Sequence, residues 1–206
     1  MTEHDRAHRP ARFADLTELI DAAGGSASPV SRAEIAAATA AIVVNAGRHR
    51  KGEADLVALA DTVGIDTLAE LWRDSDPVSL PGALWALYLL RQWCRSNGEE
   101  VMRFWRAGQP LAPADSVVAG VADDADLEAV RRVADAVLTG AYEGDFAVAL
   151  ERAAALFRVV AAGRRDMATG LDEIEAAGEL ERARRNERVA AGLATAAARW
   201  RDGTLH

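Results

Sequence analysis

The feature that most restricts the fold of this chain is a run of eight consecutive apolar residues at positions 83–90. Ser79 stands before the run as a helix N-cap, Pro81 follows in the first turn, and Asn97 with the next glycine ends the pattern. A helix that is apolar on every side is enclosed by other helices. The run is far shorter than the roughly 20 apolar residues that cross a bilayer. We therefore predict residues 83–95 as the central helix of a soluble bundle.

The composition of the whole chain favours helices. It contains 46 alanines against 16 glycines and 6 prolines, so strong helix formers are abundant and turn residues are few. We predict an all-α fold, a bundle of about eight or nine helices. Residues 1–12 have no hydrophobic period and are predicted as a mobile N-terminal tail. Residues 13–206 then form a single domain, with a subdomain break near 76–80 as the alternative.

The positions of the other helices are predicted from apolar residues at helical spacing. They are predicted over 13–23, 31–45, 56–63, 65–72, 99–107, 127–138, 146–162 and 171–200, with a short turn of helix at 117–121. Asp123, Asp124 and Asp126 precede the helix at 127. Their spacing lacks the alternating oxygens and the glycine of a calcium loop. We interpret them as N-terminal acids of a helix and predict no metal site.

Charge argues against polyanionic partners. The formal net charge of −8 repels nucleic acid and anionic membranes, and neither is a predicted partner. The helices at 56–63 and 65–72 meet at a glycine as in a helix-turn-helix, but Asp66 and Glu70 would face the phosphates. Cys94 is the only cysteine, so no internal disulfide can form, and no apolar leader follows residues 1–12. A cytoplasmic location is expected.

No motif for catalysis is present in the sequence. The nucleophile elbow, the phosphate-binding loop, the dinucleotide fingerprint and the zinc-protease motif are all absent. Cys94 lies inside the apolar helix and is predicted to be a buried, inert thiol. No histidine stands in a predicted core helix, which argues against a di-iron bundle. We therefore predict no catalytic residue, no metal and no cofactor, and favour a non-enzymatic function.

The best candidate for a binding surface is a set of aromatic and arginine side chains on the helices over 83–95 and 99–107. Aromatic rings stack on planar groups, and guanidinium groups bind anions through paired hydrogen bonds. The predicted ligand-binding residues are Trp85, Tyr88, Arg91, Trp93, Arg95 and Trp105. The alternative interpretation is an ordinary core with arginines at its rim.

Two functions are consistent with these observations. The first is a helical interaction or scaffold protein that binds another protein or itself. A homodimer is suggested by Ala183, Ala190 and Ala197, which recur every seven residues and would let two helices approach closely. The alternative is a small-molecule-binding or regulatory protein, with a small anionic or aromatic ligand held between helices by the aromatic and arginine residues.

Two segments carry a resemblance to known sequences. Residues 79–91, from Ser79-Leu80-Pro81-Gly82 onward, and residues 144–154, from Gly144-Asp145-Phe146-Ala147 onward, are similar to segments of an uncharacterised family of all-helical actinobacterial proteins with no assigned activity. The resemblance implies a bacterial cytoplasmic protein and carries no activity with it. The second segment also resembles half of a tetratricopeptide hairpin, but no 34-residue repeat accompanies it.

Overall fold

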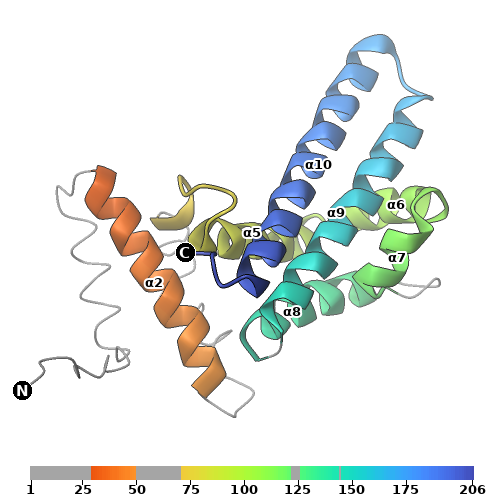
Figure 1. Cartoon of the computed structure of the whole chain (residues 1–206). Helices are drawn as coiled ribbons and strands as arrows, with labels where there is room; N and C mark the ends of the chain where they lie inside the picture. Colours follow the sequence, from red (N-terminus) through yellow and green to blue (C-terminus); the bar gives the residue numbers. More distant parts are fainter. Residues whose placement is uncertain (1–28, 50–70, 122–125, 144) are drawn as a thin grey trace, which may run out of the picture.

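A computed structural model describes residues 29–49, 71–121, 126–143 and 145–206. Over these residues the chain forms seven α-helices, one 3₁₀ turn and no strand, which confirms the all-α class (Figure 1). The elements are α2 (Pro29–His49), α5 (Leu80–Ser96), α6 (Gly98–Gly108), η1 (Gln109–Leu111), α7 (Pro113–Ala119), α8 (Leu127–Glu143), α9 (Phe146–Ala168) and α10 (Glu173–Arg201).

Every helix predicted within the described ranges is present, with ends displaced by a few residues. The count of seven in these ranges is slightly below the eight or nine expected for the whole chain. The predicted tail at 1–12, the helices over 13–23 and 56–63, and most of the helix over 65–72 lie outside the described residues.

Helices α9 and α10 are the two longest and run side by side as an antiparallel pair, which projects from the rest of the bundle (Figure 1). Each begins at an aspartate N-cap. The carboxylate of Asp145 accepts hydrogen bonds from the backbone N–H groups of Ala147 and Val148, at 2.9 and 3.3 Å. Asp172 accepts in the same way from the second and third residues after it. These caps satisfy N–H groups that a helix start leaves without an internal partner.

Alanines line the contact between these two helices. Ala183, Ala190 and Ala197 are each at most 1% exposed, and α10 packs mainly along α9, which is itself rich in buried alanine. Small side chains on both helices let the two backbones approach closely. The prediction that these three alanines form a homodimer seam is therefore wrong, because the chain's own helices already cover them.

Helix α9, more than α5, is enclosed at the centre of the bundle. It packs against α5, α6, α7, α8 and α10, and 15 of its 23 residues are buried. Helix α5 also has five neighbours and buries Leu84, Leu87 and Leu90, each at most 1% exposed. Leu89, however, is 43% exposed and Trp85 is half-buried. The prediction that α5 is enclosed on every side is therefore wrong for one face of the helix. On the face that carries Trp85 and Leu89, the neighbouring helices leave an opening between α5 and α10.

Helix α6 crosses α9 at a contact between two glycines. A Cβ atom on Gly163 of α9 would overlap the carbonyl oxygen of Phe104 and would lie 2.8 Å from its carbonyl carbon. A Cβ atom on Gly108 of α6 would overlap the carbonyl oxygen of Val159 in the same way. Only glycine lets two backbones touch at this distance. The contact brings α6 close enough to bury Phe104 and Trp105, which are 2% and 1% exposed.

Two of the helix N-termini predicted from the sequence have the side-chain-to-backbone hydrogen bond of an N-cap. The hydroxyl of Ser79 accepts from the N–H of Gly82 at 3.2 Å, at the start of α5. The carboxylate of Asp126 accepts from the N–H of Ala129 at 2.7 Å, at the start of α8. Asp126 thus acts as a helix cap, as predicted.

Candidate functional site

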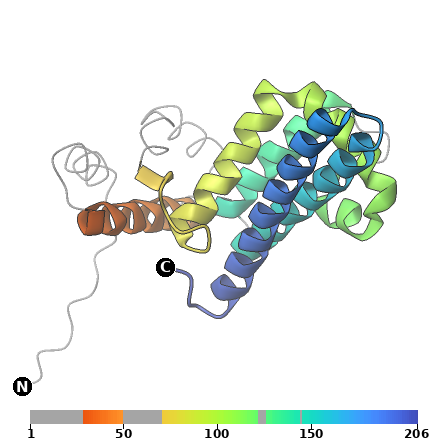
Figure 2. The same cartoon turned by 90° about the horizontal axis from the view of Figure 1, so that it is seen from above.

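A cleft of about 550 Å³ lies between α5 and α10, two helices that Figure 2 shows side by side from above. The turn at 73–77 and two residues of α9 complete it. The lining residues are Arg73, Ser75, Pro77, Gly82, Trp85, Ala86, Leu89, Trp93, Phe157, Arg164, Arg182, Arg185, Asn186, Val189 and Leu193. The cleft opens beside the face of α5 on which Leu89 is exposed.

Helical spacing explains how the sequence builds the two walls. Residues three or four apart lie on the same face of a helix, and both helices contribute such a stripe. The stripe on α5 consists of Gly82, Trp85, Ala86, Leu89 and Trp93, and that on α10 of Arg182, Arg185, Asn186, Val189 and Leu193. Each stripe spans twelve residues, and the eleven steps of 1.5 Å between its ends make the cleft roughly 16 Å long.

The two stripes run in opposite directions. At one end Pro77, which packs beside Gly82, also lies against Gly192, where an added Cβ would be 3.6 Å from the Cβ of Pro77. At the other end the guanidinium of Arg164 lies 5.5 Å from the ring centre of Trp93, and its Nη1 donates to Glu179 at the start of α10. The beginning of α5 therefore faces the end of α10.

Aromatic rings form the apolar part of the cleft. Trp93 stacks on Phe157 of α9, with ring centres 6.3 Å apart and planes 8° from parallel. Trp85 stacks on Tyr88, with ring centres 5.6 Å apart. These contacts hold the indoles of Trp85 and Trp93 in place while both side chains stay half-buried at the cleft. Fixed rings of this kind provide a surface for a planar or aliphatic group.

Arginines form most of the polar part of the cleft. They differ in how many carboxylates each of them pairs with. Arg164 is buried and donates to Glu179 at 2.5 Å and to Glu100 at 3.4 Å. Arg182 donates to the same Glu179 at 2.7 Å. Arg185 has no hydrogen-bond or ion-pair partner among the residues that the structure describes. Arg185 is therefore the arginine of α10 best able to bind an anion.

Two of the six predicted ligand-binding residues, Trp85 and Trp93, line the cleft. Tyr88 lies behind the first of them and supports its ring. Arg91 and Arg95 lie toward α8, where both pair with Asp135, at 2.7 and 3.5 Å. These two arginines are one turn apart on α5 and share a face of that helix. That face lies against α8, whereas the face with Trp85 and Trp93 lies at the cleft.

Trp105 also lies outside the cleft, because it is part of the core and only 1% exposed. The structure therefore places the predicted tryptophans of α5 at the cleft, and Arg91, Arg95 and Trp105 away from it.

The cleft is also lined by residues that are not among the predicted ligand-binding residues. They are Phe157, Arg164, Arg182, Arg185 and Asn186. Three of these belong to the stretch 179–188, which is charged on nearly every side, a pattern typical of an exposed or interdomain part of a helix. In the sequence, the three residues of α10 could have been recognised as a stripe at helical spacing that continues into Val189 and Leu193. Nothing in the sequence shows that this stripe faces the tryptophans of α5.

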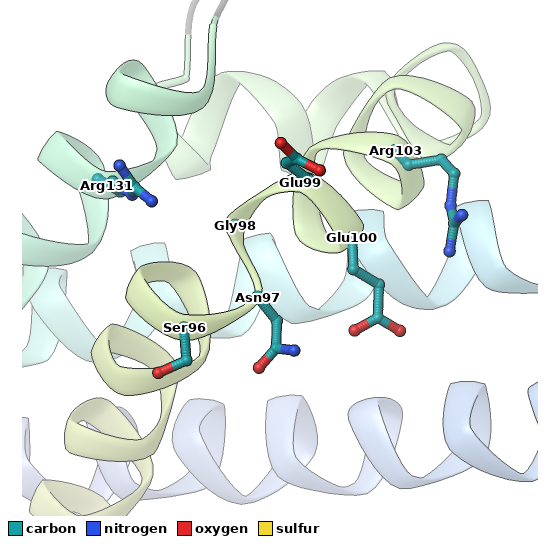
Figure 3. A pocket seen from close by; sticks show the side chains of 7 residues that line it. All are labelled: Ser96, Asn97, Gly98, Glu99, Glu100, Arg103 and Arg131. Carbon is teal, nitrogen blue, oxygen red and sulfur yellow. The ribbon is translucent and has the colours of Figure 1, made fainter.

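A second cleft, of about 610 Å³, lies where α5 meets α6. Figure 3 shows the side chains around it, with Arg131 coming from α8 and the others from the junction itself. The residues are Ser96, Asn97, Gly98, Glu99, Glu100, Arg103 and Arg131. The lining includes two carboxylates and two guanidinium groups, and no aromatic or aliphatic side chain. The charges are balanced and most of the lining surface is polar, so this cleft is the weaker candidate for a ligand.

Cys94 is fully buried in α5. Burial, and to a smaller extent the negative charge of Asp135, raises the pKa of its thiol from 9.0 to about 12. Because only the thiolate is a nucleophile, we expect Ellman's reagent at about pH 8 to leave the folded protein unmodified and to label it fully in denaturant. Rapid labelling of the folded protein would contradict the burial of this thiol.

The same pKa shift gives a pH dependence of stability. The unfolded chain releases the thiol proton near pH 9.0, whereas the folded chain holds it up to about pH 12. The contribution of Cys94 to stability is therefore complete below pH 9.0 and is lost as the pH rises between these values. Urea titrations at increasing alkaline pH should show a smaller loss of stability for Cys94→Ala than for the parent protein.

Comparison of the chain with protein-family models, with curated proteins and with solved structures gives no match. Within the described ranges, no helix is both long and apolar enough to span a membrane. Over the same residues, no three histidine, cysteine or acidic side chains gather as metal ligands would.

Proposed function

We propose that this chain is a non-enzymatic binding protein for a small molecule, which it holds in the cleft between α5 and α10. The observation that carries the proposal is the composition of that cleft. Three aromatic rings and four arginines line it, and no carboxylate is among its lining residues. Its volume of about 550 Å³ falls within the range of about 300–1,000 Å³ that small-molecule sites occupy. The ligand has an apolar or planar body and a negatively charged group.

The chemistry of the lining supports binding in preference to catalysis. Proton transfer near neutral pH uses imidazole, carboxylate, thiol, amine or phenol groups. The polar side chains that line the cleft are arginines, one asparagine and one serine. An arginine stays charged at physiological pH, so it binds anions through fixed hydrogen-bond donors.

A fluorescence titration with 1-anilinonaphthalene-8-sulfonate, which has a planar body and one sulfonate, tests the proposal. We expect saturable binding of one probe per chain. Leu89→Asp places a charge in the cleft at a position that is already 43% exposed, so the fold is expected to persist. This variant should bind the probe at least about tenfold more weakly, a loss of about 1.4 kcal/mol.

The matched control is Leu111→Asp, since Leu111 is 57% exposed on η1 and does not line the cleft. The control should bind the probe as the parent protein does. Equal binding by Leu89→Asp and the parent protein would overturn the proposal.

A protein-interaction function is the second candidate, and a separate surface favours it. Val117 and Val118 on α7 are 81% and 49% exposed, and Leu111 on the neighbouring η1 is also exposed. Exposed apolar side chains are common where a protein binds another protein, provided that they form a continuous patch. Light scattering over a wide concentration range tests self-association. A constant monomer mass would exclude a second copy of the chain as the partner.

The proposed setting is the cytoplasm of a bacterium. The buried, protonated thiol of Cys94 is compatible with a reducing compartment, where disulfides are rare. Membership of the actinobacterial family that residues 79–91 and 144–154 resemble is part of the same proposal.

A further inference from the structure

We propose that the ligand is a single-chain amphiphile with one acidic head group, lying lengthwise in the cleft between α5 and α10. Its head binds at the end formed by Arg182, Arg185 and Asn186, and its tail points toward Pro77 and Leu193. This inference rests on the proposed function and specifies the ligand class and its orientation.

The two ends of the cleft differ in polarity. Pro77, Gly82 and Leu193 form one end, and Ala86 and Val189 continue the wall toward the middle. No hydrogen-bond donor is offered by these five side chains. Arg73 and Ser75 of the same turn also line the cleft, and Arg73 already has an interaction of its own. This end therefore suits an aliphatic tail.

The opposite end carries three of the four arginines that line the cleft. Arg164 lies over the rings of Trp93 and Phe104, 5.5 and 4.0 Å from their centres. Its guanidinium is held by Glu179 and Glu100, and Glu179 also accepts from Arg182. With Arg185 included, three guanidinium groups face two carboxylates. One positive charge is left over, which matches a ligand with a single negative charge.

Two donors at this end have no partner among the described residues. The Nδ2 atom of Asn186 is buried and makes no hydrogen bond. Arg185, its neighbour on α10, has no ion-pair partner there. A buried amide donor without a partner costs stability, and an acid head group placed between the two residues would supply the acceptor for both.

Length agrees with this orientation. Trp85 and Trp93 stand eight residues apart on α5, a separation of about 12 Å along the helix. Trp93 lies at the arginine end, beside Arg164, and Trp85 lies one turn from Gly82 at the apolar end. An extended chain that runs between them would place its tail near Trp85 and its head near Trp93.

Bromine atoms quench tryptophan only at short range, so brominated dodecanoic acids test the orientation. Used below their micellar concentrations, 12-bromododecanoate carries the bromine at the tail and 2-bromododecanoate carries it beside the head. Quenching by the tail bromine should be lost in Trp85→Phe and kept in Trp93→Phe. The head bromine should give the opposite pattern. A reversed pattern, or equal quenching in both variants, would overturn the orientation.

The charge of the head is tested separately. Arg185→Gln should weaken the binding of 12-bromododecanoate by about tenfold and leave 12-bromododecan-1-ol unchanged. Arg184→Gln is the matched control on α10, because Arg184 is exposed and lies outside the lining, and it should leave both affinities unchanged.

Equal binding of the acid and the alcohol by the parent protein would refute the acidic head and leave the proposed function standing. Failure of both brominated acids to bind, with the anilinonaphthalene sulfonate still bound in the cleft, would refute the amphiphile alone. Loss of that probe's cleft binding as well would refute the proposed function itself.

Discussion

Replacing Gly163 with alanine is expected to lower the free energy of unfolding by about 3 kcal/mol or more, one of the two largest effects that the structure predicts. The new Cβ would overlap the carbonyl oxygen of Phe104 and would lie 2.9 Å from the backbone nitrogen of Gly108. Both neighbours are backbone atoms of α6, so no side chain can rotate away. The clash must separate α6 from α9, which would open the core around Trp105.

Urea unfolding followed by circular dichroism measures this loss. Gly178→Ala is the matched control, because Gly178 also lies within a helix but an added Cβ would only meet the end of the Arg182 side chain, at 3.7 Å. Alanine is the better helix former, so the control should gain about 0.5–1 kcal/mol. If the two variants changed stability in the same direction and by similar amounts, the glycine contact between α6 and α9 would be disproved.

Replacing Trp105 with alanine is expected to cost about 3–5 kcal/mol of stability, because a fully buried indole leaves a large cavity. The binding of the anilinonaphthalene probe should be unchanged in the fraction that stays folded, since Trp105 does not line the cleft. Thermal and urea unfolding measure the first effect, and a titration of the folded variant measures the second.

Trp105→Phe separates loss of volume from loss of the indole nitrogen. The Nε1 atom of Trp105 is buried and has no hydrogen-bond partner within the described structure. Phenylalanine keeps most of the apolar volume and removes this unsatisfied donor, so the variant should lose less than about 1.5 kcal/mol. A stable Trp105→Ala variant with weakened probe binding would instead show that Trp105 belongs to the ligand site.

Local chemistry made the helices predictable from the sequence. Ser79 and Asp126 stand before helices and make the hydrogen bonds that N-caps make. The apolar spacing after Asp145 continues through α9, so the sequence predicted that helix over most of its length. Signals of this kind act within one or two turns of a single helix.

The candidate site was only partly predictable, because it depends on which helices meet. Trp85 and Trp93 share a face of α5, and the sequence identified both as candidates. Arg182 and Arg185 come from a stretch about 90 residues further along the chain, and no local pattern connects them to those tryptophans. Arg91, although close to Trp93 in sequence, pairs with Asp135 on α8 instead.

The alanines of α10 illustrate the same limit. Their seven-residue spacing correctly indicated a close contact between helices, but small side chains do not specify whether the neighbour belongs to the same chain. The fold resolves this in favour of α9, which leaves Ala183, Ala190 and Ala197 buried within the chain.

Composition, periodicity and capping residues by themselves thus determined that this chain is helical, where most of its helices begin, and which of their faces are apolar. The tertiary structure alone decided that α9 is the most enclosed helix, that one face of α5 stays open, and that the arginines of α10 complete a cleft there. The physical reason is the distance along the chain over which each kind of interaction acts. Hydrogen bonds at helix ends and apolar periods act between residues near in sequence, whereas a cleft is made by packing between residues far apart in it.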